Sequence, residues 1–145
     1  MIKISIIIPA FNEQATIIEL LEKVDEQNID AIEFQIIVID DGSSDKTVAL
    51  LETRPELYSK LVKQAQNRGK GAAVKAGLAQ ADGDYILFQD ADLEYDPADY
   101  IKLVEPVLRF DADVVMGSRM VGSPITRVSY FWHKLGNWVI TLVFN

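Results

Sequence analysis

Short apolar runs alternate along this chain with segments in which apolar residues recur every three to four positions. The apolar runs predict five strands, over residues 4–8, 34–39, 60–63, 84–89 and 113–116. The periodic segments predict four helices, over residues 15–26, 45–53, 71–80 and 97–110. Regular alternation of strand and helix indicates an α/β fold with a mainly parallel sheet. Because the runs are almost continuously apolar, helices should cover both sheet faces, as in a Rossmann-like three-layer α/β/α arrangement.

Composition and charge limit the classes of function. The chain has 145 residues, enough for one domain with its own core, and a formal net charge of −8. An excess of acid argues against a nucleic-acid partner, because phosphate backbones are bound through basic surfaces. The sequence has no cysteine, which excludes disulfides and thiolate metal sites and fits a reducing compartment.

Targeting signals give an expectation about location. The first residues lack the features of a signal peptide, and no apolar stretch reaches the length of about 18 residues that a transmembrane helix needs. We therefore expect a cytoplasmic protein, either free or peripheral at the cytoplasmic face of a membrane.

Polar residues gather where each predicted strand ends. The five polar clusters cover residues 9–13, 40–45, 67–71, 90–94 and 117–119. In an open parallel sheet, ligands bind beyond the carboxyl ends of the strands, near the point where the strand order reverses. One such cluster is ordinary loop chemistry, whereas five at the same sheet edge predict a binding site.

Asp90 and Asp92 stand one residue apart, directly after an apolar run. Carboxylates at the mouth of a core strand are costly to desolvate unless they have a partner, and a divalent cation is the usual partner where oxygens converge. An oxygen-only ligand set suits Mg²⁺ or Mn²⁺, with substrate phosphates completing the coordination. Glu94 is a third candidate ligand, directly or through water. The alternative is a helix cap followed by solvated loop acids.

The second cluster contains two acids, Asp40 and Asp41, that a simple turn leaves unexplained. A carboxylate at this place could accept the imide N–H of a uracil or the N–H donors of a guanine. The neighbouring Ser44 and Asp45 are explained as caps of the following helix.

The third cluster leads from a glycine-rich turn into a helix, where backbone N–H groups and Lys70 could meet an anion. A plain helix start explains its two glycines equally well. A dinucleotide fingerprint would need a third glycine where Val74 stands, and the Walker-type Gly-Lys-Ser/Thr is absent from the sequence. Holding of a phosphate through a metal at Asp90 and Asp92 therefore fits better than holding by a glycine-rich loop.

In this order and spacing, the motifs resemble family 2 glycosyltransferases, especially the dolichol-phosphate mannose synthase branch and its bacterial polyprenyl-phosphate relatives. The resemblance runs from about position 4 to position 144 and rests on Ile8-Pro9-Ala10-Phe11-Asn12-Glu13, Val38-Ile39-Asp40-Asp41-Gly42-Ser43-Ser44-Asp45, Asn67-Arg68-Gly69-Lys70-Gly71, Asp90-Ala91-Asp92-Leu93-Glu94-Tyr95-Asp96-Pro97 and Gly117-Ser118-Arg119. It implies a GT-A fold and an inverting, metal-dependent transfer of a sugar from a UDP- or GDP-sugar donor, with Mg²⁺ or Mn²⁺ as the cofactor.

The resemblance also implies roles for individual residues. Those expected to contact the donor are Pro9, Phe11, Glu13, Ile39, Asp41, Lys70, Asp90, Ala91, Asp92 and Arg119. The first three would line the nucleoside pocket, with Ile39 and Asp41 beside the base. Asp90, Asp92 and Glu94 are the implied metal ligands. Asp92 and Arg119 are the implied catalytic residues, because the cation and Arg119 would offset charge on the leaving diphosphate.

We expect two parts in the chain: a nucleotide-sugar-binding GT-A core over 1–120, and over 121–145 the start of an acceptor or membrane-proximal segment. The expected acceptor is a polyprenyl (dolichyl-type) phosphate, which Arg127, His133 and Lys134 could meet. A glycan hydroxyl is the alternative acceptor.

The apolar residues 138–144 pack on the sheet, join a partner or a membrane surface, or belong to a polypeptide that is cut short. Because family domains commonly continue further, we expect C-terminal truncation, with a donor-binding fragment without activity as the alternative to an active enzyme. A sugar nucleotidyltransferase is disfavoured, because its glycine- and basic-rich loop after the first strand is missing.

Overall fold

The computed structural model describes residues 1–117. The chain divides into two units, Met1–Ala112 and Asp113–Asn145. The first unit is described completely, whereas only residues 113–117 of the second are described. Arg119 and the expected acceptor segment 121–145 lie outside the described residues.

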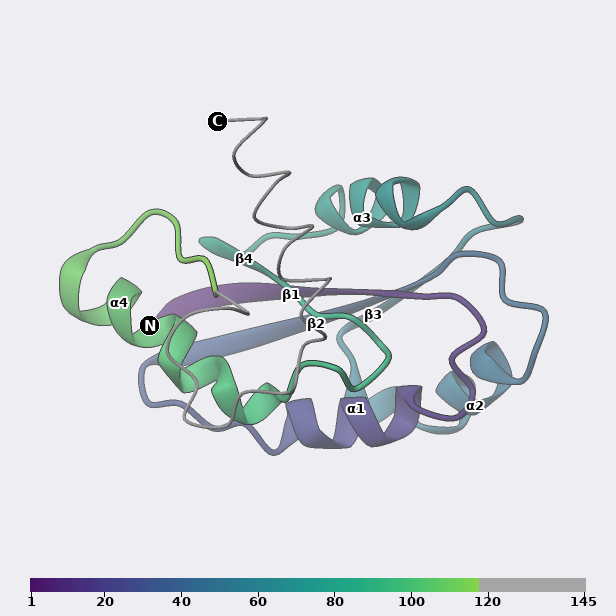
Figure 1. The fold of residues 1–145 in the computed structure, drawn as a ribbon, viewed down its shortest axis with the longest axis horizontal. Coiled ribbons are helices and arrows are strands. Elements are labelled where there is room, and N and C mark those ends of the chain that lie inside the picture. Colours follow the sequence, from purple (N-terminus) through teal and green to yellow (C-terminus); the bar gives the residue numbers. More distant parts are fainter. Residues whose placement is uncertain (118–145) are drawn as a thin grey trace, which may run out of the picture. The chain divides into compact units, whose positions relative to one another are not determined.

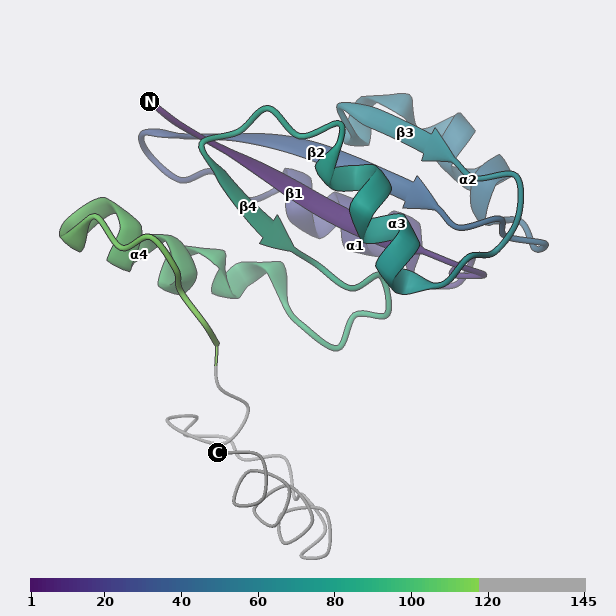
Figure 2. The same ribbon diagram turned by 90° about the horizontal axis from the view of Figure 1, so that it is seen from above.

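The first unit is built on a four-stranded parallel sheet in the order β3-β2-β1-β4. The strands are β1 (Ile2–Ala10), β2 (Ile32–Asp40), β3 (Lys60–Lys63) and β4 (Tyr85–Phe88). Along β1, Ile6 pairs with Ile36 of β2 on one side and with Leu87 of β4 on the other. The chain adds strands on one side of β1 and then crosses to its other side, as Figure 2 shows, so the strand order reverses at β1. The predicted parallel α/β sheet is confirmed.

Helices cover both faces of this sheet (Figure 1). The helices are α1 (Ile17–Asp25), α2 (Thr47–Thr53), α3 (Lys70–Leu78) and α4 (Tyr100–Phe110), with short 3₁₀ turns at Pro55–Leu57 and Pro97–Asp99. Helix α3 lies on one face, and α1, α2 and α4 pack on the other. The predicted three-layer arrangement is therefore confirmed.

The larger core lies between the sheet and α1. Apolar residues of α1 recur at helical spacing, and those that are buried are Ile17, Leu20, Leu21 and Val24. They belong to the same cluster as alternate residues of β1, Ile4, Ile6 and Ile8, which point to this face. Sequence periodicity thus directs one stripe of α1 and one face of β1 toward each other.

The smaller core lies under α3, which packs closely on the sheet at Gly77. Its buried members are Ile7, Ile37, Ile39 and Ala73. A Cβ added at Gly77 of α3 would lie 2.7 Å from side-chain carbons of Ile7 and Ile39, so the missing side chain permits this approach. The last turn of α3 thereby lies directly against Ile7 of β1 and Ile39 of β2.

The strand predicted over residues 113–116 is not observed, so this prediction is wrong. Residues 113–116 form no strand, and the side chains of Val114 and Met116 are 77% and 87% exposed. An apolar, β-branched run predicts strand propensity, but a strand forms only where a neighbouring strand supplies hydrogen bonds. Within residues 1–117, no strand pairs with this run. None of the helices described is long and apolar enough to span a bilayer.

Candidate functional site

A cavity of about 330 Å³ opens at the carboxyl ends of β1, β2 and β4, beside the start of α3. Its lining residues come from four separate loops and are Pro9, Ala10, Phe11, Glu13, Asp41, Asn67, Gly69, Lys70, Ala73, Asp90, Ala91 and Asp92. This is the edge at which open parallel sheets bind ligands, next to the strand where the order reverses.

Asn12 ties the loop after β1 to the loop after β2. Its side-chain oxygen accepts the backbone N–H of Ser44 at 2.8 Å and of Asp45 at 3.3 Å. Its own backbone N–H donates to the hydroxyl of Ser43 at 2.9 Å. Asn12 adopts a positive φ of 58°, a conformation that asparagine tolerates better than most residues. Its neighbours in sequence, which line the cavity, are therefore carried by a loop anchored at both sides.

Asp41 ties the loop after β2 to the start of α3. Only 3% of it is exposed, and its two carboxylate oxygens accept the backbone N–H groups of Arg68 at 3.0 Å and Gly69 at 2.8 Å. The loops also touch at Gly42, whose φ is +72° and where a Cβ would lie 2.6 Å from the backbone nitrogen of Asn67. Only glycine fits there, because backbone atoms cannot move aside as a flexible side chain can.

The other acids of the second loop have structural partners. Both oxygens of Asp40 accept the backbone N–H of Ser43, at 3.3 and 3.2 Å. Asp45, one residue before the N-cap Lys46, accepts the backbone N–H of Thr47, the first residue of α2, at 2.9 Å, and so satisfies a donor at the helix start. The carboxylates that the sequence left unexplained thus hold loops together, and Asp41 in addition faces the cavity.

Gln89 shapes the loop that carries Asp90 and Asp92. It is buried, and its side-chain amide donates to the carbonyl oxygens of Asp90 at 3.0 Å and Tyr95 at 3.1 Å. Its side-chain oxygen accepts the hydroxyl of Tyr100 at 2.9 Å. Burial raises the pKa of Tyr100, so this hydroxyl remains a donor at neutral pH. Sequence reasoning missed Gln89; the available signal was a polar residue directly after an apolar strand.

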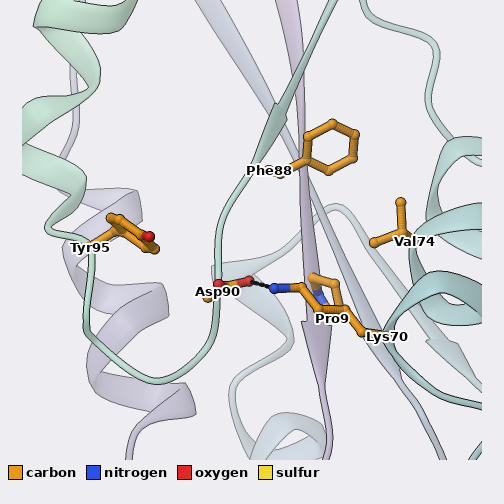
Figure 3. A pocket seen from close by; sticks show the side chains of 6 residues that line it. All are labelled: Pro9, Lys70, Val74, Phe88, Asp90 and Tyr95. Carbon is orange, nitrogen blue, oxygen red and sulfur yellow. Dashed lines mark hydrogen bonds and ion pairs between the residues drawn. The ribbon is translucent and has the colours of Figure 1, made fainter. Parts of the chain in front are cut away.

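Lys70 and Asp90 form an ion pair across the cavity. The ammonium nitrogen lies 2.5 Å from a carboxylate oxygen of Asp90 (Figure 3). A second cavity, also of about 330 Å³, adjoins this pair and is lined by Pro9, Lys70, Val74, Phe88, Asp90 and Tyr95. The two cavities share Pro9, Lys70 and Asp90, so the ion pair lies between them.

Most of the residues predicted at the donor come together. Those that line the first cavity are Pro9, Phe11, Glu13, Asp41, Lys70, Asp90, Ala91 and Asp92. Ile39 does not line it, because its side chain is fully buried in the core under α3. Arg119 lies outside the part of the chain that is described.

The acidic side chains that line the cavity could hold a divalent cation only together with ligands from a substrate. Within residues 1–117 there is no group of three or more histidine or acidic side chains that could bind a metal ion, and Glu94 does not line the cavity. Asp90 and Asp92 do share the cavity, and Asp90 already holds a positive charge, the ammonium of Lys70. Mg²⁺ commonly uses one or two carboxylates together with substrate phosphates. The residues present therefore fit a metal that arrives with a diphosphate.

A parallel α/β sheet with this cavity at its reversal point has the GT-A fold of the glycosyltransferase structures that it resembles. Residues 5–139 match the family model described as Glycosyl transferase family 2. The chain belongs to this family.

One similar protein is a dolichol-phosphate mannosyltransferase from Pyrococcus furiosus, 31% identical over 134 residues, which are 92% of this chain and 38% of that protein. A structure of S. aureus TarS 1-349 in complex with UDP matches with a TM-score of 0.68 and 26% identity, covering 85% of this chain and 38% of that one. The mannosyltransferase PcManGT from Pyrobaculum calidifontis, in complex with GDP-Man and Mn²⁺, matches with a TM-score of 0.56 and 32% identity, covering 61% and 27%. The chain thus spans less than half the length of these proteins.

Proposed function

We propose that this chain binds the donor of an inverting glycosyltransferase, which moves a sugar from a UDP- or GDP-sugar to a polyprenyl (dolichyl-type) phosphate. The observation that carries the proposal is that loops from four strand ends bring Glu13, Asp41, Lys70, Asp90 and Asp92 to one cavity. The relatives support it, because they include a dolichol-phosphate mannosyltransferase and structures in complex with UDP and with GDP-Man.

The nucleoside lies along the first two loops in this proposal. Phe11 is 44% exposed and lines the cavity, so its ring offers an apolar surface beside Pro9. Each oxygen of Asp41 accepts one backbone N–H and retains a further lone pair, with which it can accept an N–H of the base. Ile39 contributes indirectly, because it belongs to the core under α3 that supports the residues lining the cavity.

The diphosphate lies at the start of α3 and beside Asp90 and Asp92. Lys70 supplies a positive charge, and the N–H groups of Lys70 and Gly71 precede the first hydrogen bond of α3, which Ala72 donates to the carbonyl oxygen of Gly69 at 2.9 Å. Asp90 and Asp92 would hold Mg²⁺ or Mn²⁺, and Glu94 would be a further ligand, directly or through water. A divalent cation bound there supplies charge that offsets the charge growing on the leaving diphosphate. Arg119 is proposed to add to this effect.

Transfer breaks the bond between the anomeric carbon and the donor phosphate oxygen and forms a bond to the acceptor oxygen on the opposite face. A lipid phosphate is already anionic, so it needs no general base. A sugar hydroxyl, the alternative acceptor, would need a carboxylate base. We assign the acceptor contacts and any membrane-surface contact, at the cytoplasmic face, to residues 121–145, and the donor core to residues 1–120.

A second candidate is a donor-binding fragment that does not catalyse. It is favoured by one observation, that the chain covers only 38% of the dolichol-phosphate mannosyltransferase. The two candidates share the donor site and differ only in acceptor transfer.

Calorimetry with UDP and GDP, in Mn²⁺ and in excess EDTA, tests the donor site. We expect one nucleotide to bind in Mn²⁺ and to bind at least tenfold more weakly in EDTA. Absence of binding by both nucleotides would rule out the donor site, and equal binding in EDTA would rule out the metal. Transfer of radiolabelled sugar to polyprenyl phosphate then separates an active enzyme from a donor-binding fragment.

A further inference from the structure

The proposed metal ligand Asp90 already has a cation, and the chain itself supplies it. The Lys70 ammonium lies 2.5 Å from Asp90, and both residues line both cavities. The carboxylate of Asp92, by contrast, accepts the backbone N–H of Glu94 at 3.0 Å, a short local contact within its own loop. A metal ion that uses both carboxylates would therefore meet the Lys70 ammonium at Asp90 and compete with it for the charge of this carboxylate.

The two partners differ in how firmly they are held. The side chain of Asp90 is 29% exposed, and Gln89 binds its backbone carbonyl oxygen at 3.0 Å. The side chain of Lys70 is 65% exposed, although its backbone is fixed because Asp41 binds the N–H of the preceding Gly69 at 2.8 Å. Figure 3 shows the Lys70 side chain reaching from α3 to Asp90. Because its base is anchored and its end is exposed, the ammonium can change partner while α3 stays in place.

We infer that Lys70 competes with the metal for Asp90, so that the site accepts a cation and a diphosphate together and rejects the cation alone. In the empty site Lys70 neutralises Asp90. When a diphosphate and its cation enter, Asp90 takes the cation and the Lys70 ammonium turns to the diphosphate. This inference rests on the proposed donor site and adds an order of binding to it.

The energy scale permits the exchange. An exposed ion pair contributes about fivefold at most to an equilibrium constant, so Lys70 leaves Asp90 without a large cost. Removing the charge of Lys70 also removes its repulsion of the metal ion. At short range in water this repulsion changes the metal affinity by a similar factor. Together the two effects predict about a tenfold change in metal affinity.

The first measurement is Mn²⁺ binding without nucleotide, followed by electron paramagnetic resonance of the free ion, on the full chain. Lys70→Met should bind Mn²⁺ about tenfold more tightly than the wild type, and Lys70→Arg, which keeps the charge, should stay near the wild type. Lys75→Met removes the same charge from an exposed position on α3 that lines neither cavity and should change nothing. Equal or weaker binding by Lys70→Met would overturn the inference.

A second pair of measurements locates the effect and tests the exchange. Adding Asp90→Asn to Lys70→Met should cancel the gain in Mn²⁺ affinity; a gain that persists places the ion elsewhere and overturns the inference. Saturating UDP or GDP should raise Mn²⁺ affinity more in the wild type than in Lys70→Met, since only the wild type can move an ammonium to the diphosphate. An equal increase in both proteins would contradict the exchange. If neither nucleotide binds the wild type, the proposed function fails, while the nucleotide-free measurement still decides whether Lys70 competes for Asp90.

Discussion

The carboxylate of Asp41 accepts the backbone N–H of Gly69 at 2.8 Å, although the two residues are 28 positions apart. This bond joins the end of β2 to the first turn of α3, and Lys70 follows directly. One buried side chain thereby places a wall of the candidate donor cavity and the residue that pairs with Asp90.

Asp41→Asn should therefore lower both stability and nucleotide affinity. An amide has one acceptor oxygen, so its NH₂ group would face a backbone N–H of Arg68 or Gly69. We expect unfolding free energy to fall by about 1–3 kcal/mol, the range for a buried group left without its partner. Chemical denaturation measures the loss. Asp30→Asn, at an exposed position, is the control and should leave the midpoint unchanged.

Gly42→Ala should destabilise the protein more than Gly71→Ala. At Gly42 the backbone has a φ of +72°, and the new Cβ would lie 2.6 Å from backbone atoms of the third loop. We expect a loss of about 2 kcal/mol or more from strain and backbone displacement. A Cβ at Gly71 meets nothing within 4 Å, and alanine favours helices by about 1 kcal/mol over glycine. Equal melting temperatures for the two variants would show that the contact at Gly42 is unimportant.

Tyr100→Phe removes the donor that satisfies the side-chain oxygen of buried Gln89. Near neutral pH we expect a loss of about 1–2 kcal/mol in unfolding free energy. Burial raises the pKa of Tyr100, so above a pH of about 10 the unfolded chain loses this proton while the folded chain retains it. Stability from this group is thus present below pH 10 and declines above it.

The wild-type advantage over Tyr100→Phe should therefore shrink as the pH rises from 9 to 11. Denaturation curves of both proteins across this range isolate Tyr100, because the other groups titrate equally in both. A constant difference would mean that the hydroxyl is not buried in the folded protein.

Asp92→Ala should remove metal-dependent nucleotide binding and leave the fold intact. The side chain is exposed, and its one described partner is the backbone N–H of Glu94. We expect nucleotide affinity in Mn²⁺ to fall to the level seen in EDTA, with a loss of stability of about 1 kcal/mol or less. Calorimetry and thermal melting measure the two effects. Unfolding of the variant would instead assign Asp92 a structural role. Asp99→Ala is the control, because Asp99 is an exposed acid that does not line the cavity.

Much of the fold was readable from local pattern. Apolar periodicity identifies the strands, because both sheet faces of β1 and β2 are buried, and it identifies the stripe of α1 that faces them. The position of the polar residues after each strand was equally readable, since parallel strands place their carboxyl ends at one edge. These features depend on residues close in sequence.

The tertiary structure decided which residues meet. Ile39 precedes the acids of the second loop yet points into the core under α3, because alternate residues of a strand face opposite sides. Gln89 acts through Tyr100, and Lys70 reaches Asp90, over separations of 11 and 20 positions. The run at 113–116 forms no strand because a strand needs a hydrogen-bonding neighbour. The sequence by itself determined the elements and the chemistry at their ends, and long-range packing decided their partners.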